Sequence, residues 1–323
     1  MPLHAASFAG HLSIIQLLIA NNAQLDAYAN GEYAPIHIAA KAGHTDVLKL
    51  FLDQGISPEM KTKDGVTPLS LASMSGNINA VQLLLKRNAD LSTTCNEGLQ
   101  PIHLAASCGK KDIVSLLVGH DVDMLARNNN GLSRRFSASS IVEATDSYGW
   151  TPLHYAARTN YSETAKFLIE QGASMIAVDN KGWTPFHFAA SQPNADTMRV
   201  LLRYGADIHL LQNDHSTPLH LAAGKGQVEI MSLLLERGAD INSTVKEGWT
   251  PAHCAVQYRQ CESLSFLIEQ HVNIAIADNR GRTVMHYAIY NCHDDMVDLL
   301  IEAGADVCTA DANRVSSIAV ASL

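Results

Sequence analysis

The sequence has few charged residues and no segment that would place it in a membrane or outside the cell. Charged residues make up 17% of the 323 residues and hydrophobic residues 47%, a balance typical of a folded chain and not of a disordered one. No apolar run approaches the roughly 20 residues of a membrane helix, and the first residues lack the features of a secretory signal. We therefore expect a folded cytoplasmic or nuclear protein without membrane insertion.

The usual sequence marks of catalysis and of nucleic-acid binding are also missing. The chain contains no Gly-x-x-x-x-Gly-Lys phosphate loop, no His-Glu-x-x-His helix and no Gly-x-Ser-x-Gly elbow. Its 6 cysteines include no Cys-x-x-Cys pair, so we expect reduced thiols. The net charge of -9, without a basic cluster, disfavours binding to nucleic acids. We expect no catalysis, no cofactor and no nucleic-acid partner.

What the sequence does contain is a tetrapeptide such as Thr-Pro-Leu-His that returns every 33 residues. Its proline falls at two series of positions: Pro2, Pro35, Pro68 and Pro101, and then Pro152, Pro185, Pro218 and Pro251. Val284 and Ser317 continue the second series. The step between the two series is 18 residues too long. The sequence therefore predicts ten tandem units, the first and last incomplete, with one insertion.

Each unit carries signals for two short helices and a turn. A threonine such as Thr67 before the proline is a typical N-cap, and the proline suits the first helical position. A glycine eight residues later ends this helix, and apolar spacing such as Val47, Leu50 and Phe51 predicts a second one. A left-handed residue is expected twenty residues after the proline. Glycine, or a type that tolerates positive φ, occupies this slot, as at Asn22, Asn88, Asp121 and His271.

These features resemble the ankyrin repeat family, which also shows paired alanines and Gly-Ala-Asp segments such as residues 205–207. The resemblance implies an all-α repeat solenoid of ankyrin-type helix-turn-helix units joined by β-hairpin turns. It divides the chain into units 1 to 4 at 1–131, an inserted serine-rich loop at 132–149, and units 5 to 10 at 150–323. We expect one continuous, monomeric array.

Eight of the 15 histidines occupy one repeat position, two residues after the proline. In ankyrin repeats an imidazole at this position resembles a structural hydrogen-bonding group, and we expect that role here. The remaining candidate for a metal site is the group His286, Cys292 and His293 with Asp294 and Asp295. Its residue types could bind zinc, but the spacing matches no known ligand pattern, so we expect no metal.

The resemblance implies a non-catalytic scaffold that binds partner proteins, of unknown identity, through a concave face of turn tips and first helices. Aromatic residues and arginine carry much of the energy of protein interfaces. We therefore predict that partners bind a set called here the aromatic stripe: Tyr148, Trp150, Arg158, Trp183, Trp249, Tyr258, Arg282 and Tyr290. A tryptophan beside a turn glycine also packs on the neighbouring turn, so for the three tryptophans both roles stay open.

Two residues are candidates for modification. Arg134-Arg135-Phe136-Ser137 in the insertion resembles a site for a basophilic kinase, and phosphorylation of Ser137 would place negative charge beside two arginines. The alternative is an inert loop. Asn242 resembles the turn asparagine that an oxygen-dependent hydroxylase modifies in many ankyrin repeats.

The two ends of the sequence fall inside a unit, which leaves two interpretations open. The chain is either a slice of a longer protein or a complete chain with frayed ends. The first interpretation leads to an alternative function, in which this is the ankyrin segment of a larger enzyme, channel or toxin and recruits its substrate or target.

Overall fold

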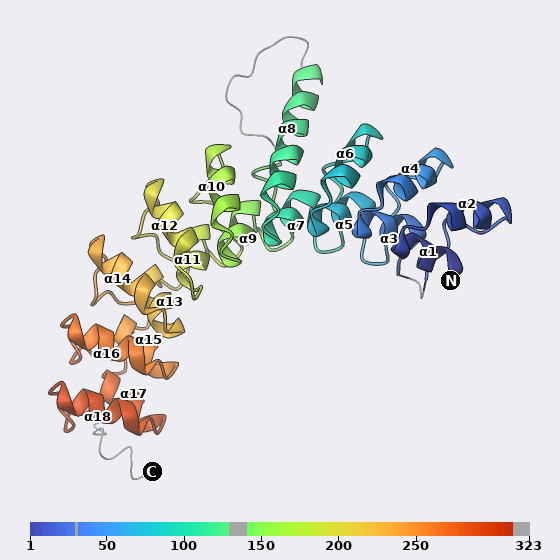
Figure 1. Ribbon diagram of the computed structural model, residues 1–323. Coiled ribbons are helices and arrows are strands. Elements are labelled where there is room, and N and C mark those ends of the chain that lie inside the picture. Colours follow the sequence, from blue (N-terminus) through green and yellow to red (C-terminus); the bar gives the residue numbers. More distant parts are fainter. Residues whose placement is uncertain (30–31, 129–140, 313–323) are drawn as a thin grey trace. The chain divides into compact units, whose positions relative to one another are not determined.

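The computed structural model describes residues 1–29, 32–128 and 141–312, which form helices joined by turns (Figure 1). They divide into two compact units, an N-terminal unit, Met1–Ser174, and a C-terminal unit, Met175–Leu323. The described residues contain 18 α-helices, and an isolated β-bridge joins Ala29 and Tyr33. The predicted all-α repeat fold is confirmed. In the described part of the chain, no helix has the length and apolar character that crossing a membrane requires.

The N-terminal unit consists of five helix pairs. The first helices of these pairs are α1 (Pro2–Ala9), α3 (Pro35–Ala42), α5 (Pro68–Ser75), α7 (Pro101–Ser107) and α9 (Pro152–Arg158). The second helices are α2 (Leu12–Ala20), α4 (Thr45–Asp53), α6 (Ile78–Lys86), α8 (Lys111–Asn128) and α10 (Ser162–Glu170). First helices of consecutive pairs contact one another, and so do second helices. Each pair buries its apolar side against its neighbours, as expected for repeat proteins.

The C-terminal unit continues this pattern with four pairs. Its first helices are α11 (Pro185–Ala190), α13 (Pro218–Lys225), α15 (Pro251–Gln257) and α17 (Val284–Tyr290). Its second helices are α12 (Asp196–Arg203), α14 (Val228–Glu236), α16 (Cys261–Glu269) and α18 (Asp294–Glu302). The side chains of Phe186, Leu234 and Leu267 are fully buried in this unit, which places the core between the helices of each pair and the next.

The first helices start as the sequence predicts, with proline at the first position in all of them except α17, which starts at Val284. In α5 the Thr67 hydroxyl accepts a hydrogen bond from the Ser70 N–H at 3.2 Å. Where the repeat carries histidine, the ring also takes part in the cap, because Nδ1 of His154 accepts from the Thr151 N–H at 3.0 Å. These contacts satisfy backbone donors that the helix itself leaves without a partner.

A left-handed residue follows each first helix except α11, either directly or after one further residue. The predicted glycines adopt this conformation, with φ of 71° at Gly10 and 82° at Gly76. The same conformation persists where the sequence has no glycine, with φ of 57° at Asn160, 52° at Arg259 and 54° at Cys292. An L-residue other than glycine is strained in this region by roughly 1 kcal/mol. The repeat geometry therefore overrides the local preference at Arg259 and Cys292.

The second helix of the fourth pair, α8, departs from the prediction. Asn22, Asn88 and His271 adopt the expected positive φ, at 61°, 58° and 62°. Asp121 was expected to do the same, but this prediction is wrong, because α8 continues through it to Asn128. Residues 120–127 read HDVDMLAR and contain no glycine, proline or asparagine, so nothing in them stops a helix.

The turn before α9 has the same contacts as the other turns. Ile141 and Val142 are buried, with exposed fractions of 5% and 0%. The Asp146 N–H donates to the Trp150 carbonyl at 3.1 Å, the hydrogen bond that also closes the other turns. Residues 141–149 thus include a turn of the kind found between the other units. The division into 1–131, 132–149 and 150–323 stays a prediction.

We predict that the substitution Cys292→Gly stabilises the protein by about 1 kcal/mol, because glycine adopts positive φ without steric strain. Cys292 is exposed, so little packing is lost. Chemical denaturation of the full chain would measure the gain. The control is Cys308→Gly, at another exposed cysteine whose φ is not positive, which should give no gain. Equal effects of the two substitutions would contradict the strain argument.

Candidate protein-binding surface

Most of the repeated histidines connect their unit to the next one. In most of them Nδ1 accepts from a backbone N–H at the start of the first helix; for example, the Gln100 N–H donates to His103 Nδ1 at 3.1 Å. The Nε2 atoms lie against carbonyl oxygens of the following turn: His4 to Tyr33 at 3.1 Å, His37 to Met60 at 2.8 Å, His103 to Ala144 at 2.9 Å, His187 to Leu210 at 3.0 Å, His220 to Trp249 at 3.0 Å and His253 to Arg282 at 3.2 Å. A ring nitrogen facing a carbonyl must donate, so the network requires the neutral tautomer with the proton on Nε2.

Burial keeps these imidazoles neutral. The pKa of His187 and of His220 is lowered to about 4, mainly by desolvation. Hydrogen bonds to carbonyl oxygens raise the pKa, but their effect is smaller. The pKa of His37, His103 and His253 is lowered for the same main reason. A neutral imidazole with both nitrogens occupied is suited to neither acid catalysis nor metal binding. The histidines therefore have the structural role that the sequence predicts.

His286 differs from the other histidines of this position. Its Nδ1 accepts from the Thr283 N–H at 3.2 Å, but its Nε2 has no hydrogen-bond partner within residues 1–29, 32–128 and 141–312. Neither His286 nor His293 belongs to a group of three or more possible metal ligands within those ranges. Burial also raises the pKa of the Cys254 thiol to about 12, so this thiol remains protonated and is a poor nucleophile.

Three residues of the aromatic stripe form a cluster in the N-terminal unit. The ring of Trp150 packs on Tyr155 with centroids 5.1 Å apart, and the Arg158 guanidinium lies 4.9 Å from the Trp150 ring centroid. Tyr148 lies beside Trp150, at 6.4 Å between centroids, and is 54% exposed. Asp146 accepts from the Tyr155 hydroxyl at 2.6 Å, which fixes the ring under the tryptophan. The cluster presents an aromatic and cationic surface on a rigid base.

The other five residues of the stripe lie in the C-terminal unit and differ in exposure. Trp183 packs on Phe188 at 4.9 Å and Trp249 on Tyr287 at 5.0 Å between centroids, so both tryptophans have a packing role. Arg282 pairs with Asp311, with 3.5 Å from Nε to the carboxylate. Arg282 and Tyr290 line a small cavity of about 30 Å³.

Tyr258 and Tyr290 are the most exposed rings of the stripe, at 61% and 69%. The Tyr258 ring lies against Gly224 of α13, where an added Cβ would lie 3.0 Å from the ring. Glycine at this position therefore allows the ring to lie close to the preceding helix. Gln257, next to Tyr258, accepts from the Asn291 amide at 3.3 Å, which joins α15 to the end of α17.

Of the two modification candidates, only Asn242 lies in the described part of the structure. It is half-buried, and its side-chain oxygen accepts from the Asn273 N–H at 2.9 Å. Glu59 and Glu143 make the same contact in their units, with the N–H groups of Asp90 and Ser174. Asn242 thus holds consecutive turns together. Ser137 lies outside the described residues.

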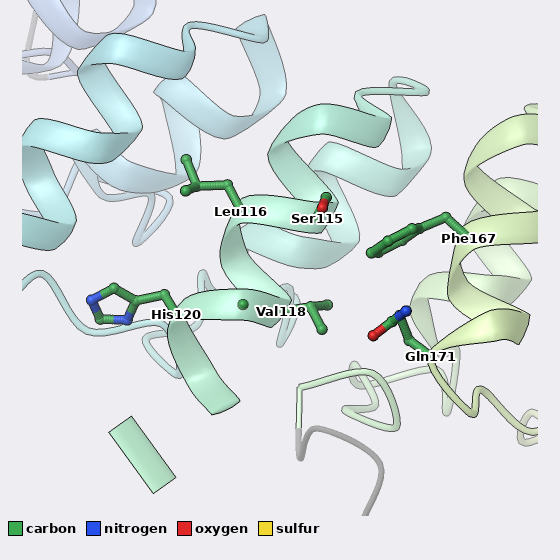
Figure 2. Close-up of a pocket in the computed structure, with 7 residues that line it drawn as sticks. Ser115, Leu116, Val118, His120, Phe167 and Gln171 are labelled. Carbon is green, nitrogen blue, oxygen red and sulfur yellow. The ribbon is translucent and has the colours of Figure 1, made fainter. Parts of the chain in front are cut away.

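The sequence did not indicate two cavities of the N-terminal unit. One of about 610 Å³ lies between second helices, and Figure 2 shows Phe167 of α10 and Gln171, which follows α10, across from Ser115 and Val118 of α8. The other, of about 350 Å³, lies on the first helices and is lined by Phe8, Tyr33, Ile38, Lys41, Ala42 and Ser75. Each cavity is lined by residues of different repeats, so no local sequence motif predicts it.

Comparison with known proteins identifies the family. The family model described as ankyrin repeats, three copies, matches residues 3–95, 36–128, 92–179, 175–245 and 241–311. The chain belongs to the ankyrin repeat family. A search among curated proteins finds no match.

Solved structures of ankyrin repeat domains are similar to this chain. The human ASB11 ankyrin repeat domain is 28% identical, with a TM-score of 0.60, over 74% of this chain and 99% of that domain. The ankyrin repeat domain of Bcl-3, described as a unique member of the IkappaB protein family, is 27% identical with a TM-score of 0.56. That match covers 69% of this chain and 94% of Bcl-3's domain.

We predict that the stability of the folded chain decreases as the pH falls from 6.5 towards 4. In the unfolded chain His187 and His220 take up protons below about pH 6.5, whereas in the folded state their pKa is about 4. The unfolded state binds more protons in this window, so each histidine lowers the free energy of unfolding by about 1.4 kcal/mol per pH unit.

Urea denaturation at pH 7 and pH 5 would measure this loss. The variant His220→Gln, which cannot titrate, should show a smaller difference between the two pH values than the unchanged chain. An unchanged denaturation midpoint between pH 7 and pH 5 would show that the histidines are not held neutral by burial.

Proposed function

We propose that this ankyrin repeat chain is a protein-binding scaffold that recognises partner proteins through exposed side chains on its first helices and turns. The observation that carries the proposal is the exposure of Tyr148 in a turn and of Arg158, Tyr258 and Tyr290 at the ends of first helices. Large aromatic rings and arginine contribute most of the energy in protein interfaces. Because these side chains are exposed, they are available to contact a partner.

The rigid attachment of these side chains supports the proposal. The histidine contacts and the packed tryptophans fix the backbone and the base of each cluster before a partner arrives. Less conformational freedom is then lost on binding, and more of the contact energy appears as affinity. In this interpretation Trp150, Trp183 and Trp249 serve both roles, because each supports an aromatic neighbour and keeps part of its ring exposed.

A non-catalytic role is part of the proposal. Buried histidines of the repeat position such as His220 are neutral and hydrogen-bonded, and the Cys254 thiol is protonated. Their chemistry supports the repeat geometry instead of a reaction. The location in cytoplasm or nucleus and the monomeric state are proposed on the sequence features alone.

We expect the double substitution Tyr258→Ala and Tyr290→Ala to weaken partner binding by about 30-fold or more, because interface residues of this kind contribute about 2 kcal/mol or more. The two rings are mostly exposed, so the melting temperature should change little. Affinity capture from cell extract followed by quantitative mass spectrometry would identify partners that the unchanged chain retains and the variant loses.

The matched control is Ile301→Ala, which removes a half-exposed apolar side chain from the second helix α18. A second variant, Tyr148→Ala with Arg158→Ala, tests the cluster of the N-terminal unit separately. If every partner binds both double variants as it binds the control, the aromatic stripe is not the binding surface.

The family resemblance also supports Asn242 as a substrate of an oxygen-dependent asparagine hydroxylase. Because its side chain is held by the Asn273 N–H at 2.9 Å, we expect slower modification of the folded chain than of a synthetic peptide spanning residues 232–252. Mass spectrometry after incubation with such an enzyme would detect the added oxygen. A peptide that remains unmodified would remove Asn242 as a site, and Ser137 remains a proposed kinase site to be examined in phosphopeptide data.

A further inference from the structure

The cavity on the first helices of the N-terminal unit has the dimensions of a ligand pocket. It measures about 350 Å³, within the range of pockets that hold small ligands or large side chains. Its lining comes from α1, α3 and α5 and the turn before α3, and consecutive helices of this group contact each other (Figure 1). We call this cavity the α1–α5 groove.

The backbone of the α1–α5 groove is fixed by side chains from other repeats. The Phe8 carbonyl accepts from His44 Nε2 at 2.8 Å, and the Tyr33 carbonyl accepts from His4 Nε2 at 3.1 Å. The Lys41 carbonyl accepts from the Asn77 side-chain amide at 2.8 Å. Three groove residues are therefore held in place without a ligand, which reduces the ordering that binding would require.

The groove is apolar, and it carries one positive charge. Phe8 is 73% exposed and Tyr33 is half-buried. Lys41 is the one charged residue in the sequences of α1, α3 and α5, and its ammonium lies 5.7 Å from the centroid of the Tyr33 ring. A carboxylate brought next to this ammonium would meet no negative side chain from the three helices.

We propose that the α1–α5 groove binds a short peptide segment of a partner protein in which a large apolar side chain stands next to an Asp or Glu. The apolar side chain packs on Phe8 and Tyr33 and fills the cavity, and the carboxylate pairs with Lys41. An exposed aromatic ring such as that of Phe8 is a suitable anchor for such a segment, and the positive charge of Lys41 favours an acidic peptide over a basic one. This site uses no residue of the aromatic stripe.

The test uses the full chain and a phage-displayed library of random 12-residue peptides. We expect the selected peptides to be enriched in sequences that place Phe, Trp, Leu or Ile within three residues of Asp or Glu. Fluorescence anisotropy with synthetic versions of these peptides then measures their affinities for the variants.

We expect Phe8→Ala and Lys41→Glu each to weaken binding by at least about 10-fold, with unchanged melting temperatures because both side chains are exposed. Lys41→Met should keep the apolar preference and lose the acidic one. The control Lys49→Glu, on α4, makes the same change of charge at another exposed lysine and should bind as the unchanged chain does.

Selection without this enrichment, or equal affinities for the Lys41→Glu and Lys49→Glu variants, would overturn the proposal. The variant with Tyr258→Ala and Tyr290→Ala separates it from the aromatic stripe. Peptides that lose binding only in that variant would contradict the groove and support the stripe, whereas peptides that depend on Phe8 and Lys41 support the groove whatever happens to the stripe.

Discussion

The hydrogen bond from a buried histidine to a carbonyl oxygen of the following turn is the interaction on which this structure depends. In His37 one ring nitrogen accepts from the Ala34 N–H of its own unit and the other faces the Met60 carbonyl of the next turn. The same ring therefore completes a helix cap and fixes the position of its neighbour. Because the ring is buried and neutral, the bond requires no charge to be desolvated, and the motif can be repeated along the chain.

Features that depend on this local chemistry could be predicted from the sequence. The proline and the capping threonine set the start of the first helix, and the left-handed slots follow from glycine or from types such as Asn22 and Asn88 that tolerate positive φ. Each of these signals acts within a few residues and is repeated many times, so a weak preference in one unit is supported by the same position in the others. Even Arg259 and Cys292 follow the repeat against their own preference.

Features that depend on which residues meet across repeats could not be predicted. Asp121 occupies the same repeat position as Asn22 and Asn88, but α8 continues through it. Repeat position alone therefore does not determine whether a residue is left-handed. The tryptophans share one repeat position, yet Trp150 packs on Tyr155 of its own unit and Trp249 on Tyr287 of the next unit. The α1–α5 groove likewise requires an exposed phenylalanine in one repeat, a tyrosine and a lysine in the next, and small residues around them.

Residues that repeat between units and residues that vary between them have different roles in this structure. The residues that repeat are buried or hydrogen-bonded between units, and substituting them would disturb every contact that they share. The residues that vary, such as Phe8, Tyr258 and Tyr290, are exposed and bear little of the packing, so they can change without loss of the fold. The family therefore determines the repeat fold of this protein, and in the proposed function the exposed side chains that vary between units determine what it binds.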